Sequence, residues 1–165
     1  MPQVTHDNPF FFLTSVTHDR LPVFQTDKLK TVLATAFDEA RRSCGCLFFA
    51  YAFMPDHYHI ITDGRLKLSA MLRYLNGISA RRVIDYLREN NFESSLRKLR
   101  RENAAKDGRT YSLWQPHPNK FRITTESVLM QKVHYIHQNP VEEWTCRKGR
   151  RLSLFERSIL ARPSG

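Results

Sequence analysis

Residues 46–62, CLFFAYAFMPDHYHIIT, decide the fold of this chain. The segment 46–53 is almost entirely apolar or aromatic, which predicts a β-strand buried on both faces at the centre of a sheet. HYHIIT at 57–62 predicts a second strand. The Met-Pro-Asp between them is short enough for a tight connection, in which Pro55 cannot donate to a strand ladder. The stretch therefore predicts two neighbouring strands joined by a tight turn.

Upstream of these strands the sequence predicts one more strand and an amphipathic helix. PFFFLTSVT at 9–17 is rich in aromatic and β-branched residues, which favour strands. A helix is expected to begin at Asp27 and to end at Gly45, because glycine adopts the left-handed conformation of a helix C-cap. Apolar residues recur there at the spacing of one helix face. They are Leu29, Val32, Leu33, Ala36, Phe37 and Ala40.

Downstream of the strand pair the sequence predicts two further helices. The first is a long helix over 67–90, followed by a highly charged segment, 91–110, that is either a helical extension or an exposed excursion. Short strands are expected at 111–115 and 120–124. The last helix should begin near Thr125, whose hydroxyl can cap it. Its apolar positions are Leu129, Val133 and Ile136, and Pro140 is expected to end or kink it.

The resulting order, β-α-β-β-α-β(β)-α, belongs to the α+β class. It predicts a ferredoxin-like antiparallel sheet with helices on one face, plus an appended C-terminal helix. Neither repeats nor linkers interrupt the chain, so we expect a single domain over 1–165, with a basic tail at 146–165. Such folds serve many unrelated activities, so function has to be inferred from particular residues.

The charge of the chain favours a polyanionic partner. Its 165 residues carry 26 Lys and Arg against 16 Asp and Glu, a net charge of +10. A small domain this basic most often binds nucleic acid, although a ribosome-like binder or an anionic membrane surface would account for the same charge. Hydrophobic residues make up 41% of the chain, which excludes global disorder.

Membrane insertion, secretion and disulfide stabilisation are not expected. No run approaches the roughly 18 apolar residues of a membrane span. The N-terminus has no basic stretch followed by a long apolar core, so we expect a cytoplasmic protein. Cys44, Cys46 and Cys146 do not form a disulfide framework and are too sparse for a zinc cage.

Two histidines on the second predicted strand form a candidate metal site. His57 and His59 flank Tyr58, and residues two apart on a strand share one face, so both imidazoles can turn toward a single ion. Two such ligands and a third group leave positions open for substrate. The alternative is a pair of histidines satisfied by hydrogen bonds on a half-exposed strand. A histidine-triad hydrolase would require a histidine where the chain has Ile61.

The last predicted helix carries a second polar pair. Tyr135 and Asn139 are four residues apart, so they lie on the same side of the helix, one turn apart. Tyr135 is about 100° around the helix from the buried position Ile136. Alone this is an ordinary surface pair. Facing a two-histidine metal site, it becomes a nucleophile beside a third metal ligand.

These motifs together resemble the single-tyrosine HUH transposases and, among them, the REP-associated tyrosine transposases. The resemblance rests on MPDHYHII at 54–61 and YIHQNPV at 135–141, supported by FFLTSVT at 11–17 and LWQ at 113–115, and it covers roughly residues 8–144. It implies cleavage and transfer of single-stranded DNA beside hairpins, with Mg²⁺ or Mn²⁺, through a 5′-phosphotyrosine. The oligomeric state, monomer or homodimer, stays open.

The resemblance implies a role for four residues. His57 and His59 would be metal ligands, Tyr135 the nucleophile, and Asn139 the polar ligand one turn later. Where the family usually has asparagine before the first histidine, this chain has Asp56, which either adds negative charge near the metal or caps the turn. Two alternatives remain: a non-catalytic nucleic-acid binder with this fold, and a zinc hydrolase that uses the histidine pair.

Basic residues cluster after the histidine strand. Between residues 65 and 101 ten Lys and Arg face three Asp and Glu, a net charge of +7. Such groups bind phosphates without reading sequence, and we expect this basic helix to border the histidine–tyrosine site. The alternatives are a solvated helix face and, at the C-terminus, a mobile tail. The candidate DNA-binding residues are Arg73, Arg81, Arg82, Arg88, Arg97, Lys98, Arg147, Lys148, Arg150 and Arg151.

Overall fold

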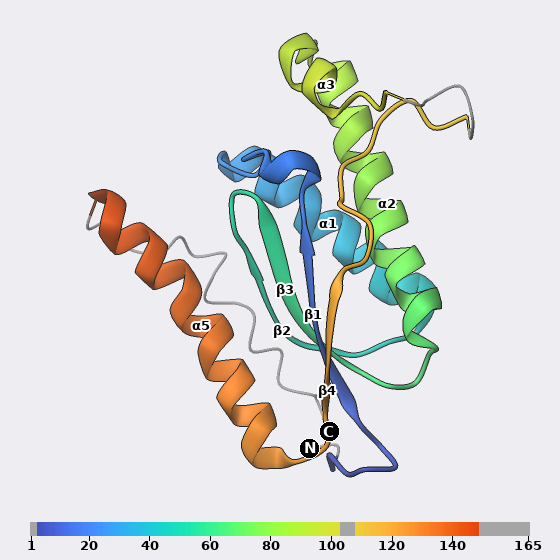
Figure 1. Cartoon of the computed structure of the whole chain (residues 1–165), viewed down its shortest axis with the longest axis vertical. Helices are drawn as coiled ribbons and strands as arrows, with labels where there is room; N and C mark the ends of the chain where they lie inside the picture. Colours follow the sequence, from blue (N-terminus) through green and yellow to red (C-terminus); the bar gives the residue numbers. More distant parts are fainter. Residues whose placement is uncertain (1–2, 103–107, 149–165) are drawn as a thin grey trace.

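Four antiparallel strands form one sheet in the computed structural model, which describes residues 3–102 and 108–148 (Figure 1). The order across the sheet is β2-β3-β1-β4, the ferredoxin-like arrangement that the sequence predicts. The elements are β1 (Phe10–Val16), the 3-10 turn η1 (His18–Arg20), α1 (Asp27–Cys44), β2 (Phe48–Phe53), β3 (His57–Asp63), α2 (Leu68–Glu89), α3 (Glu93–Leu99), β4 (Asn119–Ile123) and α5 (Glu126–Lys148).

The prediction that the apolar strand after Gly45 is central is wrong, because β2 lies at the edge of the sheet. Its apolar character has another cause. The side chains of Phe48 and Phe53 pack against Phe37 of α1, while Ala50 and Ala52 are buried on the opposite face, toward α5. A continuous apolar run indicates that other elements cover both faces of a strand. The edge strand β2 is covered by α1 on one face and by α5 on the other. The central strands are β3 and β1.

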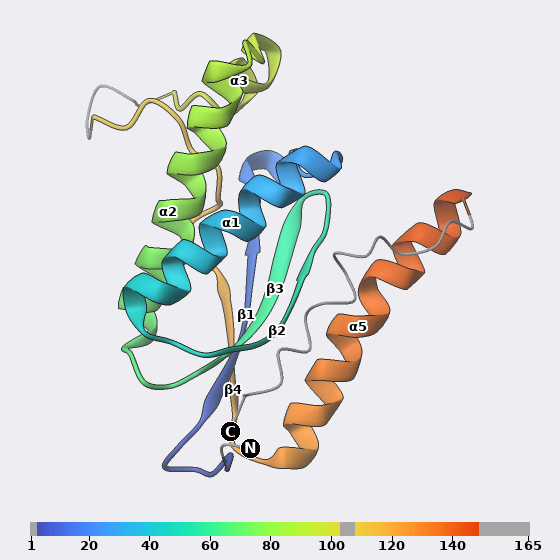
Figure 2. The ribbon, with the colours of Figure 1, turned by 180° about the vertical axis from the view of Figure 1, so that it is seen from behind.

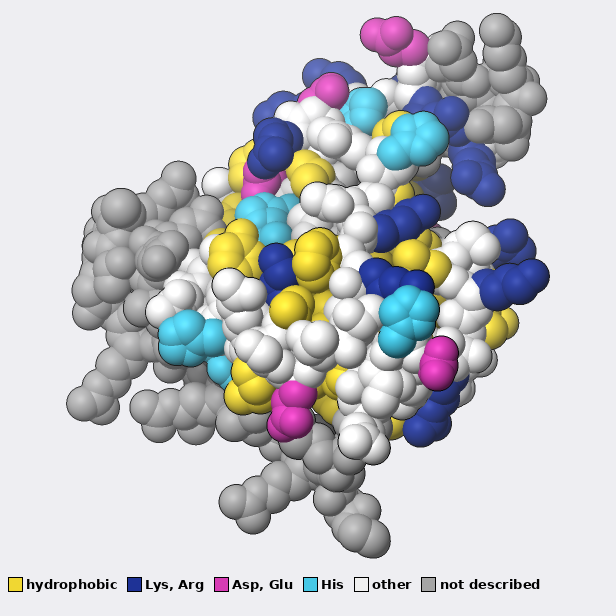
Figure 3. Space-filling view, turned by 60° about the horizontal axis from the view of Figure 1, so that its bottom comes forward, with side chains coloured by type: hydrophobic (Ala, Val, Ile, Leu, Met, Phe, Trp, Pro, Cys, Tyr) yellow, Lys and Arg dark blue, Asp and Glu magenta, His cyan; other side chains and the backbone are white. Residues whose placement is uncertain are grey.

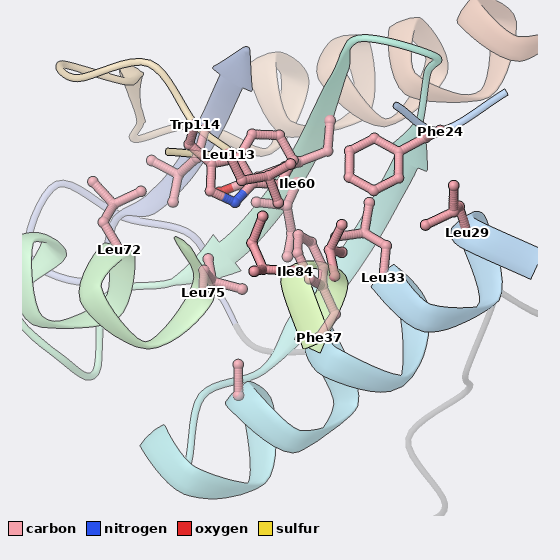
Figure 4. Packing of buried hydrophobic residues seen from close by; sticks show 14 of the residues in the cluster. Phe24, Leu29, Leu33, Phe37, Ile60, Leu72, Leu75, Ile84, Leu113 and Trp114 are labelled. Carbon is pink, nitrogen blue, oxygen red and sulfur yellow. The ribbon is translucent and has the colours of Figure 1, made fainter. Parts of the chain in front are cut away.

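Helices α1 and α2 pack together on one face of the sheet (Figures 1 and 2). Helix α1 begins after Thr26, whose hydroxyl accepts from the backbone of Leu29, and ends at Gly45 with φ of +66°. Its predicted apolar face is buried, with only Val32 partly exposed. Figure 4 shows Leu33 and Phe37 of α1 turned toward Ile84 of α2 and Ile60 of β3. The amphipathic spacing therefore predicted the buried face correctly.

Helix α5 covers the other face of the sheet (Figure 1). The Thr125 hydroxyl accepts from the backbone of Val128 at 3.3 Å, so the predicted N-cap is confirmed. Leu129 and Ile136 are each 1% exposed and pack against strand residues. Burial of such a side chain contributes about 1.5–3 kcal/mol, which fixes the helix on the sheet. The helix does not end at Pro140 but continues to Lys148, since one proline removes only one bond of the ladder.

The segment between α2 and β4 is less regular than predicted. The charged stretch does form a short helix, α3. The strand expected at 111–115 is absent from the described part of the chain and is replaced by two isolated bridges, Thr17 with Trp114 and Arg100 with Tyr111. The chain crosses between two elements here, so each residue pairs with a different partner and no continuous ladder forms. The strand expected at 120–124 is confirmed as β4.

Candidate active site and basic groove

Strand β3 divides its side chains between the two faces of the sheet, as the alternation predicts. His59 lies on the face covered by α5, where it stacks on Phe12 with ring centroids 5.2 Å apart. Tyr58 points to the opposite face, where it is fully buried. Its hydroxyl donates to Asn76 Oδ1 at 2.7 Å and lies 3.0 Å from Ser15 Oγ. The buried tyrosine therefore anchors the strand that carries both histidines.

His59 is held as a neutral imidazole. Its side chain is only 6% exposed, and burial, together with the nearby His57 and Lys132, lowers its pKa to about 4. Its Nδ1 lies 2.8 Å from Thr14 Oγ1, directly across from it on β1. With the proton on Nδ1 donated to this hydroxyl, Nε2 keeps its lone pair. A neutral ring held at one nitrogen and open at the other is the state in which histidine binds a metal.

His57 is oriented by the residue before it. Its Nδ1 donates to Asp56 Oδ1 at 2.6 Å, because a carboxylate can only accept. The other carboxylate oxygen receives Arg20 at 3.3 Å. The rings of His57 and His59 lie 4.9 Å apart, so the predicted pairing of the two imidazoles is present. The Asp56 carboxylate is therefore held between Arg20 and His57, and it orients the His57 ring.

Tyr135 reaches the histidines from α5. Its ring lies 5.5 Å from the ring of His59 and 6.0 Å from that of Phe12, edge-on to both. The side chain is 46% exposed, so a ligand in solvent can approach it. A tyrosine far away in sequence is thus brought against the histidine pair, with its ring supported on one side and open on the other.

Asn139 lies one turn after Tyr135, and its side-chain Nδ2 is buried without a hydrogen-bond partner among the side chains that the structure describes. Rotation of the amide by 180° exchanges nitrogen and oxygen, which places an acceptor where no protein donor competes for it. Among the described side chains, those of residues 3–102 and 108–139, no group of three His, Cys, Asp or Glu that could hold a metal is present. Asn139 offers an amide oxygen one turn after Tyr135, and two imidazoles with an amide oxygen would suit several divalent ions.

Three side chains at this site were missed in the sequence. Thr14 of β1 hydrogen-bonds to His59, and Arg20 of η1 hydrogen-bonds to Asp56. Nothing in the sequence around either residue indicates these contacts. Lys132 places its Nζ 5.9 Å from the centroid of the Tyr135 ring. For Lys132 a signal existed: it precedes Tyr135 by three residues and Asn139 by seven, which puts all three along one side of the helix.

The predicted DNA-binding residues lie in different surroundings. Arg73, Arg81 and Lys98 line a groove of about 1220 Å³ between α2 and the segment 109–118. Six Lys and Arg side chains and two acidic ones line it, so it is basic overall. In the face shown in Figure 3, most Lys and Arg side chains lie toward the right, with others near the top and one near the centre. Arg73, Arg81 and Lys98, which share the groove, form the candidate surface for binding the phosphate backbone of DNA.

Of the remaining candidate DNA-binding residues, three lie outside this groove, and the other four fall beyond the described side chains. Arg82 makes a bidentate ion pair with Glu39 of α1, with both hydrogen bonds at 2.8 Å. The pair lowers the pKa of Glu39 and raises that of Arg82, so both side chains stay charged. Arg88 lies over the Tyr111 ring and near Asp85. Arg97 is in the last turn of α3. The side chains of Arg147 and Lys148, and the whole of Arg150 and Arg151, lie outside the described residues.

The expectation that the basic helix borders the histidine–tyrosine site is wrong. Helix α2 packs on the face with α1, whereas Tyr135 and the histidines lie on the face with α5, so the sheet separates them. The chain leaves β3 and crosses to the far layer before α2 begins, and proximity in sequence did not indicate this. The groove approaches the site only around the end of the sheet: His18 and Asp19 line it, and the adjacent Arg20 contacts Asp56.

The exposed Tyr135 of α5 thus faces the H-x-H strand of a ferredoxin-like sheet. The sequence model of the IS200-like transposases matches residues 11–139, and the chain belongs to this family of DNA-processing enzymes. No curated protein sequence shows significant similarity to the chain. Within the described residues, no helix has the length and apolar character needed to cross a bilayer.

Several solved structures share the fold, two of which follow. One is a REP-associated tyrosine transposase bound to a REP hairpin, with 17% identity, a TM-score of 0.56, and coverage of 87% of this chain and 72% of the other. The second is a protein of Deinococcus radiodurans R1 assigned as a transposase, with 21% identity, a TM-score of 0.53, and coverage of 78% and 88%. The predicted transposase fold is therefore confirmed, including the additional C-terminal helix.

Proposed function

We propose that this chain is a metal-dependent endonuclease and strand transferase that acts on single-stranded DNA beside hairpins. One observation carries the proposal: an exposed Tyr135 is packed against His59, which is neutral and itself lies against His57. The REP hairpin bound to the structural neighbour suggests the form of the DNA.

The reaction is a transesterification at a phosphodiester. The Tyr135 oxygen attacks phosphorus; a bond between that oxygen and phosphorus forms as the bond to the 3′ oxygen breaks. The products are a 5′-phosphotyrosine and a free 3′ hydroxyl, and the phenol proton is balanced by the one that the leaving oxygen gains. The covalent intermediate keeps the phosphodiester energy for rejoining to another 3′ end.

The metal ligands would be His57, His59 and Asn139, with Mg²⁺ or Mn²⁺ as the expected ion and zinc as the alternative that the histidines also suit. A divalent ion there would polarise the scissile phosphate and stabilise charge on the leaving oxygen. The protein prepares for it in three ways: Thr14 and Asp56 hold the two rings, and burial keeps His59 unprotonated. Such outer partners orient ligands that would otherwise rotate.

DNA would be held in the basic groove, with Arg73, Arg81 and Lys98 on its phosphates. Since the groove and Tyr135 lie on opposite layers, the bound strand would pass around the end of the sheet near η1. Structured DNA would occupy the groove while its single-stranded continuation reaches the tyrosine.

The direct test is formation of a covalent protein–DNA adduct on hairpin-flanked single strands with Mn²⁺ or Mg²⁺. We expect the adduct with the wild type, its loss in Tyr135→Phe, and its retention in Tyr74→Phe. Tyr74 is a suitable control because it is also exposed, at 39%, but lies on α2. Absence of any wild-type adduct on a broad panel of oligonucleotides would overturn the proposal.

The same panel separates the alternatives. A non-catalytic binder would bind DNA without cleaving it and would keep its affinity in His57→Ala and Tyr135→Phe. A zinc hydrolase would purify with stoichiometric zinc and hydrolyse substrate in Tyr135→Phe. The exposed, ring-supported tyrosine favours the transferase over both.

A further inference from the structure

Lys132 lies in a cage of aromatic rings beside the nucleophile. Its Nζ is 4.7 Å from the centroid of Phe121, 5.0 Å from that of Phe12 and 5.9 Å from that of Tyr135. The rings come from β4, β1 and α5, so three elements converge on one ammonium. Among the side chains of residues 3–102 and 108–139, which the structure describes, no carboxylate forms an ion pair with it.

Aromatic faces hold a cation without neutralising it. The attraction between an ammonium and a ring quadrupole is about 0.5–1 kcal/mol at exposed sites and larger when water is excluded. A carboxylate partner would cancel the charge, whereas Phe12 and Phe121 position it and leave it able to attract an anion.

The position of Lys132 along α5 points this charge at the nucleophile. Residues three apart on a helix lie on the same side, so Lys132 and Tyr135 project together. The Phe121 ring beneath the ammonium is 44% exposed, so this side of the cage is open to a ligand. A lysine has a flexible four-carbon stem, which allows the ammonium to follow a phosphate.

We propose that Lys132 binds a non-bridging oxygen of the phosphate that Tyr135 attacks, with Phe12 and Phe121 holding the ammonium in place. This inference rests on the proposed function for the identity of the phosphate. It assigns a catalytic role to a residue outside the histidine, tyrosine and asparagine set. A fixed positive charge at that oxygen stabilises the negative charge that builds up as the phosphorus gains a fifth ligand.

Binding of DNA tests the contact without any cleavage. In a Tyr135→Phe background, affinity for a single-stranded oligonucleotide is measured against salt concentration. Loss of one phosphate contact lowers the slope of log affinity against log salt by about 0.7. We expect this decrease for Lys132→Met and no decrease for Lys28→Met, an exposed lysine in the first turn of α1. Equal slopes with and without Lys132 would overturn the proposal.

Single-turnover adduct formation tests the catalytic role. At saturating DNA we expect Lys132→Met to slow the step about 10²-fold, the usual effect of removing one transition-state donor. Lys132→Arg should restore part of the rate, because it returns the charge. Methionine fills similar apolar space between the rings. If Lys132 only packed α5 on the sheet, Lys132→Met would therefore change neither the rate of adduct formation nor the salt slope. That result would contradict the proposal.

A double-mutant cycle checks the cage. Phe121→Leu should slow adduct formation in the presence of Lys132 and have little effect in Lys132→Met, since the ring acts through the ammonium. The two proposals fail differently. If the wild type forms no adduct but the slope still falls in Lys132→Met, the transferase proposal is wrong and the phosphate contact stands. If the adduct forms and Lys132→Met changes nothing, only the Lys132 proposal is wrong.

Discussion

The side chain at position 56 is a carboxylate, and the structure shows which groups it contacts. Asp56 accepts from His57 at 2.6 Å and is itself paired with Arg20. A carboxylate behind a ligand histidine fixes the tautomer and raises the basicity of the ring. The sequence left open whether Asp56 adds charge near the metal or caps the turn. Only the position of the His57 ring identifies it as an orienting group.

Removing that group should weaken metal binding. We expect Asp56→Ala to lower the affinity for Mn²⁺ about 10- to 100-fold, the usual cost of losing such a partner. Asp56→Asn should lose less, because the amide oxygen still accepts from His57. Calorimetric titration of the two variants with Mn²⁺ measures this, and Asp27→Ala, an exposed acid in the first turn of α1, is the control. Equal affinities for Asp56→Ala and wild type would contradict the assignment.

The elements are joined by a small buried polar network as well as by apolar packing. Ser15 of β1, Tyr58 of β3 and Asn76 of α2 hydrogen-bond to one another under the sheet, at 2.7 to 3.3 Å. Tyr58 lies between the two histidines in sequence, so this network fixes the strand from the face opposite to the site. Burial also raises the pKa of Tyr58 far above that of a free phenol, which keeps its hydroxyl protonated as a donor.

Breaking this hydrogen-bond network should lower the free energy of unfolding measurably, although only three side chains form it. In Asn76→Ala the fully buried Tyr58 hydroxyl loses its acceptor, and an unsatisfied buried polar group costs about 1–3 kcal/mol. Urea unfolding should show that loss. The double variant with Tyr58→Phe should lose less than the sum of the two single changes. Asn90→Ala, at the exposed end of α2, should stay close to wild type. Additive losses would show that the network is not coupled.

At the scale of the whole molecule, the sheet separates the basic groove from the face that carries the histidines and Tyr135. The groove and α2 lie with α1, while Tyr135, His59 and Lys132 lie with α5. The proposed DNA-binding surface and the proposed catalytic site therefore lie on different faces and approach each other around one end of the sheet. Two adjacent arginines show how local the basic groove is, since Arg81 lines it whereas Arg82 is engaged with Glu39.

These two arginines should behave differently in DNA binding. Arg81→Gln should weaken binding of hairpin-flanked DNA and lower its salt slope by about 0.7–0.9, the loss of one phosphate contact. Arg82→Gln should leave both nearly unchanged. Neither should alter Mn²⁺ affinity, because the sheet lies between them and the histidines. Fluorescence anisotropy across a salt series measures the first two quantities. An equal loss of binding in both variants would indicate nonspecific attraction by the whole helix.

The sequence alone determined what depends on local periodicity. The face of α1, the shared side of His57 and His59, and the one-turn spacing of Tyr135 and Asn139 all follow from repeats of 3.6 and 2 residues. Caps at Thr125 and Gly45 also follow from single residue types. These features are fixed by the backbone within a few residues, so they are visible in a single sequence.

Tertiary structure decided everything that joins distant segments. It placed β2 at the edge, kept the basic helix away from the histidines, set Tyr135 against His59 and assembled the cage around Lys132. Each of these depends on which layer an element packs into, and that is settled by burial of the two apolar faces of the sheet against different helices. No local pattern carries that information, because the contacts form between residues far apart along the chain.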